Sequence, residues 1–222
     1  MGRASGELRR RRSLIIERIF ILKKVLSIIF VIATVLTLFA SCKSDKPVES
    51  GDYEYVVLED NTAKITKYLG TEAVAELDIP ASIDEYTVTV IGTEAFANVQ
   101  TITNVTTPDT LIKIEERAFE GSSIKKAFMH RSPDLAEIGA YAFAECKNLI
   151  QADMPRNLKT LGEYAYYYCD KLKIAYFRGD AENIATFAFD ACPKVTLYVK
   201  DSATKVKSYA QTYNLNTKIT DA

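Results

Sequence analysis

The chain has 222 residues, 48% of them hydrophobic and 26% charged, with a formal net charge of −1 and a single histidine. Its N-terminal part, 1–42, holds eight Lys or Arg and two Asp or Glu, a net charge of +6, so the rest of the chain carries −7. Nucleic-acid binding depends on basic side chains that neutralise phosphates. The acidic body therefore excludes a nucleic-acid-binding function.

Residues 1–42 resemble the export signal of a bacterial lipoprotein. Basic residues at Arg9–Arg12 and Lys23–Lys24 precede the run Val25–Cys42, which contains no charged side chain. The run ends in small residues before a cysteine, as a lipobox does. We predict signal cleavage between Ser41 and Cys42, which leaves Cys42 as the lipidated residue and as the membrane anchor.

The same segment has a second interpretation. The apolar run Val25–Cys42 is also long enough to cross a membrane as one helix with a basic cytoplasmic tail. For the lipoprotein interpretation, a true start near residue 22 would place Leu-Lys-Lys directly before the apolar run. Residues 43–51 are polar and lack periodicity, so we expect a flexible tether there.

Residues 52–76 are predicted to form an N-terminal β cap. Two β-prone runs, Tyr53–Leu58 and Ala63–Tyr68, flank an Asp-Asn turn at Asp60 and Asn61. Such a pattern predicts a β-hairpin. A cap is expected because the open end of a stacked repeat exposes core side chains and a strand edge.

Residues 77–195 contain five copies of one pattern, in which an aliphatic residue, a mostly small residue, two variable residues, alanine and an aromatic follow one another. The copies are Ile91–Phe96, Ile114–Phe119, Ile138–Phe143, Leu161–Tyr166 and Ile184–Phe189. Their aromatic residues are 23, 24, 23 and 23 positions apart. A fixed period in this range indicates a solenoid, in which each unit buries its apolar edge on its neighbours. We expect the Ala-aromatic pair to point inward from a turn of helix, with glycine at a sharp corner.

The repeats resemble the BspA-type leucine-rich repeat family over about residues 52–216. The fourth unit carries nearly every column of that family's pattern: Leu149, Ala152, Met154, Pro155, Leu161, Gly162, Ala165, Tyr166, Cys169 and Leu172. Glu115 and Ala185 replace the family's glycine, and the last unit lacks its proline. The resemblance implies a right-handed α/β solenoid and a secreted or cell-surface binding protein, often an adhesin, without catalytic residues.

Residues 196–222 are predicted to cap the C-terminal end. Thr196–Lys200 has the composition of a last strand, and Ser202–Tyr213 that of an amphipathic helix capped by Asp201 or Ser202. The predicted architecture is therefore a coil of about five repeat units between a β-hairpin and a helical cap.

Three cysteines, Cys146, Cys169 and Cys192, share one column of the repeat, where the first two units have Val99 and Ser122. A column that accepts Val, Ser and Cys indicates buried packing thiols. The alternatives are a disulfide between neighbouring turns and a metal site. Whether any two of these three cysteines form a disulfide is left open.

The sequence lacks the motifs of common enzymes. It contains no Ser-His-Asp arrangement, zinc-ligand spacing, Walker loop or dinucleotide fingerprint, and its only histidine is His130. We expect a non-catalytic protein without cofactor or metal.

Two outward columns of the repeat are the candidate ligand-binding face. If Ala127, Ala152 and Ala175 point inward, the residues that follow them point outward. This column reads Asp78, Thr106, Phe128, Asp153 and Tyr176, and the column beside it reads Glu76, Asn104, Lys126, Gln151 and Ile174. Exposed aromatic side chains among polar ones are typical of recognition sites, so Phe128, Tyr176, Asp153, Lys126 and Ile174 are the candidate ligand-binding residues.

The alternative is that these aromatics pack on a loop, at Arg131–Asp134 or Gly179–Asn183. We expect a surface-exposed lipoprotein of the bacterial envelope that binds a host or bacterial surface protein. A structural scaffold of the envelope and a carbohydrate-binding module, in which Phe128 and Tyr176 stack on sugar rings, are the other two classes. The ligand, the choice between inner and outer membrane, and the oligomeric state are left open.

Overall fold

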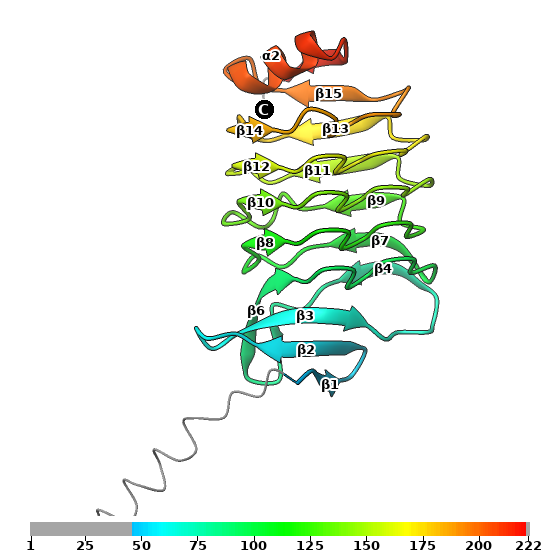
Figure 1. Ribbon diagram of the computed structural model, residues 1–222, viewed down its shortest axis with the longest axis vertical. Coiled ribbons are helices and arrows are strands. Elements are labelled where there is room, and N and C mark those ends of the chain that lie inside the picture. The colour runs from blue at the N-terminus through cyan, green and yellow to red at the C-terminus, as the bar shows by residue number, and fades with distance from the viewer. Residues whose placement is uncertain (1–45, 221–222) are drawn as a thin grey trace, which may run out of the picture. The chain divides into compact units, whose positions relative to one another are not determined.

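The chain winds into a coil in which two sheets enclose one core, and each repeat turn adds one strand to each sheet (Figure 1). The computed structural model describes residues 46–220. The predicted solenoid, its N-terminal hairpin and its C-terminal helical cap are confirmed.

The strands of the nine-stranded sheet follow the order β1-β2-β3-β6-β8-β10-β12-β14, with β5 paired to β6. They are β1 (Val48–Ser50), β2 (Tyr53–Val57), β3 (Thr62–Tyr68), β5 (Ser82–Ile83), β6 (Tyr86–Ile91), β8 (Lys113–Ile114), β10 (Glu137–Ile138), β12 (Thr160–Leu161) and β14 (Asn183–Ile184). From β6 to β14 each neighbour is parallel and two residues are paired.

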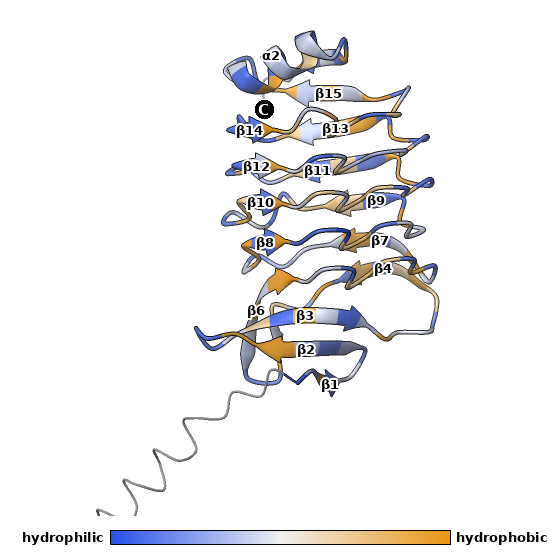
Figure 2. Ribbon diagram, viewed as in Figure 1, coloured by the Kyte–Doolittle hydropathy of each residue, from blue (hydrophilic) through white to orange (hydrophobic). Residues whose placement is uncertain are grey.

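The seven-stranded sheet is parallel throughout. It contains β4 (Val74–Asp78), β7 (Ile102–Thr106), β9 (Lys126–Phe128), β11 (Gln151–Met154), β13 (Ile174–Phe177), β15 (Thr196–Val199) and β16 (Asn216–Ile219). The helix α2 (Thr204–Thr212) lies between β15 and β16 in the chain. Hydrophilic residues gather at the corners of the coil, and the strands carry both hydrophobic and hydrophilic residues (Figure 2).

A stack of aromatic rings runs through the core beneath the turn segments. Neighbouring ring centroids are 4.8–5.3 Å apart, and successive planes differ by 2–19°. The members are Tyr68, Phe96, Phe119, Phe143, Tyr166 and Phe189. Their spacing matches the distance of about 4.8 Å between neighbouring strands, so the repeat period and ring stacking reinforce one another in an offset arrangement.

The turn segments are not helical, which corrects the turn of helix expected in each repeat. Two residues four positions apart have positive φ in each of several turns, for example 55° at both Tyr141 and Glu145. Left-handed residues interrupt a right-handed helix after less than one turn. The freed amides bond to the next turn instead, as when Phe143 N donates to Ala165 O at 2.7 Å.

The coil begins one turn earlier than the five sequence repeats. Strand β3 pairs in parallel with β6, and the Tyr68 ring stacks on Phe96. Tyr68 N donates to Ala95 O at 2.7 Å, the bond that the aromatic residue makes in the following turns. The second strand of the predicted cap is therefore also part of the coil. An antiparallel β5–β6 hairpin lengthens this first turn and conceals its period in the sequence.

At the N-terminal edge, Val48–Ser50 pair with β2 instead of belonging to the expected polar tether. The hairpin of β2 and β3 forms around the Asp60–Asn61 turn, and Asn61 has a φ of 68°. Asp84 ties these strands to the β5–β6 turn, because its carboxylate accepts from Ser50 Oγ at 2.7 Å and Tyr55 Oη at 2.6 Å.

At the C-terminal end, α2 covers the last turn with Val206, Tyr209 and Ala210. The predicted N-caps, Asp201 and Ser202, do not cap it, because the N-cap is Ala203. Asp180 of the preceding turn fills this role from outside the helix. Its carboxylate accepts from Lys205 N at 3.0 Å and from Val206 N at 3.1 Å, which places negative charge at the positive end of the helix dipole.

Candidate functional site

The seven-stranded sheet aligns the outward columns as the repeat period predicts. Asp153 pairs with Phe128 on one side and with Tyr176 on the other. Gln151 pairs with Lys126 and Ile174 in the neighbouring column. The five candidate binding residues therefore lie on adjacent positions of β9, β11 and β13.

The aromatic residues of this face are half-buried, and each contacts a long polar side chain. The Phe128 ring lies edge-on to His130, with centroids 6.1 Å apart. The Arg178 guanidinium lies over the Tyr176 ring at 5.0 Å. His130 and Arg178 stand directly before the two loops considered as alternative cover for these rings.

Asp153 is placed differently from the expectation of an exposed acidic residue. It lies in the outward column, yet its side chain is only 5% exposed. Its carboxylate accepts from Arg178 Nη2 at 2.9 Å and from Gln151 Nε2 at 2.8 Å, and His130 Nδ1 lies 3.6 Å away. The longer side chains around it cover it, so a ligand would meet Asp153 mainly through Arg178 and His130.

The aromatic column extends one strand beyond the predicted binding residues. Tyr198 of β15 pairs with Tyr176, and their rings stack with centroids 5.2 Å apart and an angle of 20°. Lys218 of β16 lies 5.4 Å from the Tyr198 ring. The signal is present in the sequence, because Tyr198 follows Tyr176 at close to one repeat period, although Tyr198 lies in the segment predicted to form the C-terminal cap.

We call one set of residues the outer cluster. Its members are Phe128, His130, Gln151, Asp153, Tyr176, Arg178 and Tyr198. Two further candidate residues lie beside the outer cluster: Lys126, which is exposed, and Ile174, which is half-buried. The cluster combines flat aromatic surface with a guanidinium that keeps some donors free, since 38% of the Arg178 side chain is exposed. This chemistry suits recognition of polar and aromatic groups.

The three repeat cysteines are free and buried. Each thiol donates to the carbonyl oxygen of an aromatic residue in the preceding turn: Cys146 to Phe119, Cys169 to Phe143 and Cys192 to Tyr166, at 2.9–3.1 Å. Burial raises the pKa of Cys146 to about 12. The column therefore consists of packing thiols, as predicted, because all three are buried, free and hydrogen-bonded to backbone carbonyls.

Within residues 46–220 no group of three or more His, Cys, Asp or Glu side chains is arranged to hold a metal ion. No helix in that part of the chain is long and apolar enough to span a membrane. The predicted signal segment, with Ser41 and Cys42, lies outside the described residues.

Solved structures share this architecture. A leucine-rich repeat protein of T. pallidum matches 69% of the chain over 72% of its own length, with 24% identity and a TM-score of 0.61. The pneumococcal vaccine antigen PcpA matches 72% of the chain over 42% of its own, with 18% identity and a TM-score of 0.53. A leucine-rich repeat protein from Bacteroides capillosus is 30% identical, with a TM-score of 0.46. The match covers 69% of this chain and 99% of the Bacteroides chain.

No curated protein matches the sequence. The family model described as "BspA type Leucine rich repeat region" matches six copies over residues 68–196. Its first copy begins at Tyr68, the residue that heads the aromatic stack. More than half of the sequence is covered, and the chain belongs to the BspA-type leucine-rich repeat family.

Proposed function

We propose that this chain is a lipid-anchored protein of the bacterial cell surface that binds a protein ligand through the outer cluster. The observation that carries the proposal is the continuous column from Phe128 to Tyr198, in which half-exposed aromatic rings surround a paired carboxylate. The proposed role is recognition, and it involves no reaction.

The outer cluster has the energetic features of a recognition site. Tyr and Arg are enriched among residues that dominate binding energy, because they bury a large area and keep polar groups that satisfy a partner. Parallel strands fix the Tyr176 and Tyr198 rings, so little side-chain entropy is lost on binding. The ion pair of Asp153 and Arg178 holds the guanidinium in place before a ligand arrives.

The anchor and the surface location rest on the sequence, where small residues precede Cys42 after an uncharged run. The pneumococcal protein of the same fold is described as a vaccine antigen, which is consistent with exposure on a cell. We expect cells that express the full chain to incorporate a labelled fatty acid into it, and Cys42→Ala to abolish that label. A Cys42→Ala chain that is still lipidated would contradict the anchor.

Ligand binding through the outer cluster is tested by removing both rings. We expect Phe128→Ala with Tyr176→Ala to weaken binding of biotinylated host-surface proteins by cells displaying the full chain by about a hundredfold or more, since hot-spot residues contribute roughly 2 kcal/mol each. The matched control removes Tyr141 and Tyr164, two rings stacked at 5.1 Å on the turn segments. Retention should then be unchanged.

Unchanged ligand binding by the outer-cluster variant would contradict the proposal. If the outer-cluster variant retains as much ligand as the unmodified chain while its melting temperature falls, the rings pack and do not bind. A parallel glycan array distinguishes protein recognition from sugar stacking on Tyr176 and Tyr198. Protection of the chain from protease on intact cells would instead favour a scaffold inside the envelope.

A further inference from the structure

The last turn of the coil leaves two backbone donors without the carbonyl acceptors that the same donors have in the four preceding turns. In each of those turns the backbone amide of the repeat's aromatic residue donates to the carbonyl oxygen of an alanine in the next turn. The backbone amide two residues later donates to a second carbonyl oxygen of that turn. These bonds run from Phe96, Phe119, Phe143 and Tyr166, and from Asn98, Gly121, Glu145 and Tyr168, at 2.7–3.2 Å. The equivalent amides of the last turn belong to Phe189 and Ala191. Neither donates to a carbonyl oxygen of the described residues, and the Phe189 amide faces the Tyr209 hydroxyl instead.

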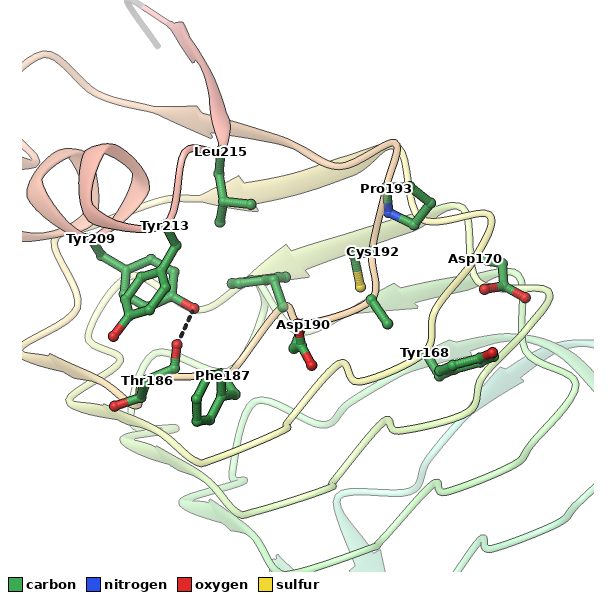
Figure 3. Close-up of a pocket in the computed structure, with 12 residues that line it drawn as sticks. Tyr168, Asp170, Thr186, Phe187, Asp190, Cys192, Pro193, Tyr209, Tyr213 and Leu215 are labelled. Atoms are coloured by element: carbon green, nitrogen blue, oxygen red, sulfur yellow. Dashed lines mark hydrogen bonds between the residues drawn. The ribbon is translucent and has the colours of Figure 1, made fainter.

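A pocket of about 510 Å³ opens beside these two amides. Tyr209, Tyr213 and Leu215 lie on one side of it, and Tyr168 and Asp170 on the other, with Asp190 and Cys192 between (Figure 3). We call it the C-terminal pocket. It lies where a further turn of the coil would sit, and α2 closes only part of that space.

The pocket carries large apolar side chains that are open to solvent. Five large hydrophobic side chains are exposed within residues 46–220, and two of them, Phe187 at 42% and Tyr168 at 44%, line this pocket. Exposed apolar side chains beside backbone donors that bond no carbonyl oxygen are the features of a strand-addition site, where main-chain hydrogen bonds give affinity and side-chain pockets give specificity.

The charge around the pocket indicates which peptide would fit. Asp170 and Asp190 are exposed on its lining, and neither forms an ion pair with any described residue. A basic side chain on the occupant would meet both carboxylates, whereas an acidic one would be repelled. In the earlier turns the accepting carbonyls are two residues apart, as with Ala165 and Tyr167, which is also the spacing of carbonyls on one edge of an extended strand.

We propose that the C-terminal pocket binds an extended segment of a partner protein. That segment would present two carbonyl oxygens, two residues apart, one to the amide of Ala191 and one to the amide of Phe189 in place of the Tyr209 hydroxyl. It would place an apolar side chain against Tyr209 and Leu215, and a lysine or arginine beside Asp190. This site is separate from the outer cluster, so its occupation does not depend on the function proposed above.

The proposal is tested with the full chain in a mild detergent and a fluorescent peptide, acetyl-Lys-Tyr-Lys-Phe-Lys-amide. We expect saturable binding by fluorescence anisotropy and slower hydrogen exchange at the amides of Phe189 and Ala191. We expect Asp190→Lys to weaken binding by about tenfold, equivalent to ~1.4 kcal/mol. The matched control is Asp109→Lys, an exposed carboxylate in the loop after β7, which should bind as the unmodified chain does.

Several results would overturn the proposal. These are no binding at millimolar peptide, equal binding of acetyl-Glu-Tyr-Glu-Phe-Glu-amide, or exchange protection that appears on the outer cluster and not at Phe189 and Ala191. Self-association of the chain through this end, without binding of the peptide, would replace the partner with a second copy. Thermal melting of both charge-reversed variants confirms that each is folded, and the exchange measurement on the unmodified chain does not depend on either variant.

Discussion

Replacement of Phe143 by alanine should lower the free energy of unfolding by about 3–5 kcal/mol, the range for removing a fully buried phenylalanine. The ring is completely buried and stacks between Phe119 and Tyr166 at 5.0 and 5.1 Å. In a solenoid each turn is stabilised only by its neighbours, so a cavity at this position weakens both adjoining interfaces. Urea denaturation followed by circular dichroism measures the change.

The control for this prediction is Phe187→Ala. Phe187 also stacks on an aromatic neighbour, Tyr164 at 5.3 Å, but it lies on the outside and is 42% exposed. We expect its removal to cost about 1 kcal/mol or less, because a partly exposed ring buries less area on folding. Equal costs for the two substitutions would mean that the core stack does not hold the turns together.

The second large effect is expected at Gly162, where alanine should destabilise the fold by about 1–3 kcal/mol or more. A β-carbon at this position would lie 2.4 Å from Ala140 N and 2.5 Å from Gly139 C. Both atoms belong to the backbone of the preceding turn, so no side-chain rotation relieves the clash. The thermal unfolding midpoint of the Gly162→Ala variant is the measurement.

Position 115 supplies the matched comparison, because it is equivalent to Gly162 in the repeat and already holds a side chain. Glu115 Oε2 accepts from Thr93 N at 3.1 Å and lies 3.6 Å from Lys64 Nζ. These exposed contacts contribute little, so Glu115→Ala should change stability by about 0.5 kcal/mol. A Gly162→Ala variant as stable as Glu115→Ala would show that the turns can move apart at no cost.

Glycine serves a different role in these turns from the one that its sequence context predicts. A sharp corner is the expected role, but Gly139 and Gly162 do not have positive φ. Their role is close approach between turns. Apart from Gly121, the left-handed positions of the turn segments are held by residues with side chains, including Tyr141 and Tyr164, whose identity gives no signal for that conformation.

The period is sufficient to predict the coil, the buried cysteine column and the alignment of the outward residues, because parallel stacking at a fixed repeat brings equivalent positions together. It is not sufficient to predict the burial of Asp153. That burial arises from Arg178 and His130, which reach it from neighbouring turns. The orientation of long side chains depends on contacts between turns, and a column alignment does not include them.

The ends of the coil are less predictable than its middle for the same physical reason. Terminal elements depart from the repeat so that they can cover it. The β5–β6 hairpin obscures the turn headed by Tyr68, and the strand β16 after α2 has no counterpart in the repeats. The C-terminal pocket results from the incomplete cover of the last turn, which the period alone does not reveal.

The proposed recognition role is tested most directly by hydrogen exchange of the full chain with and without a captured surface ligand. We predict slower exchange in residues 126–130, 151–156 and 174–178, which carry most of the outer cluster, and unchanged exchange in the turn segments around Tyr141 and Tyr164. Protection confined to those turn segments, with no change across β9, β11 and β13, would contradict the recognition role.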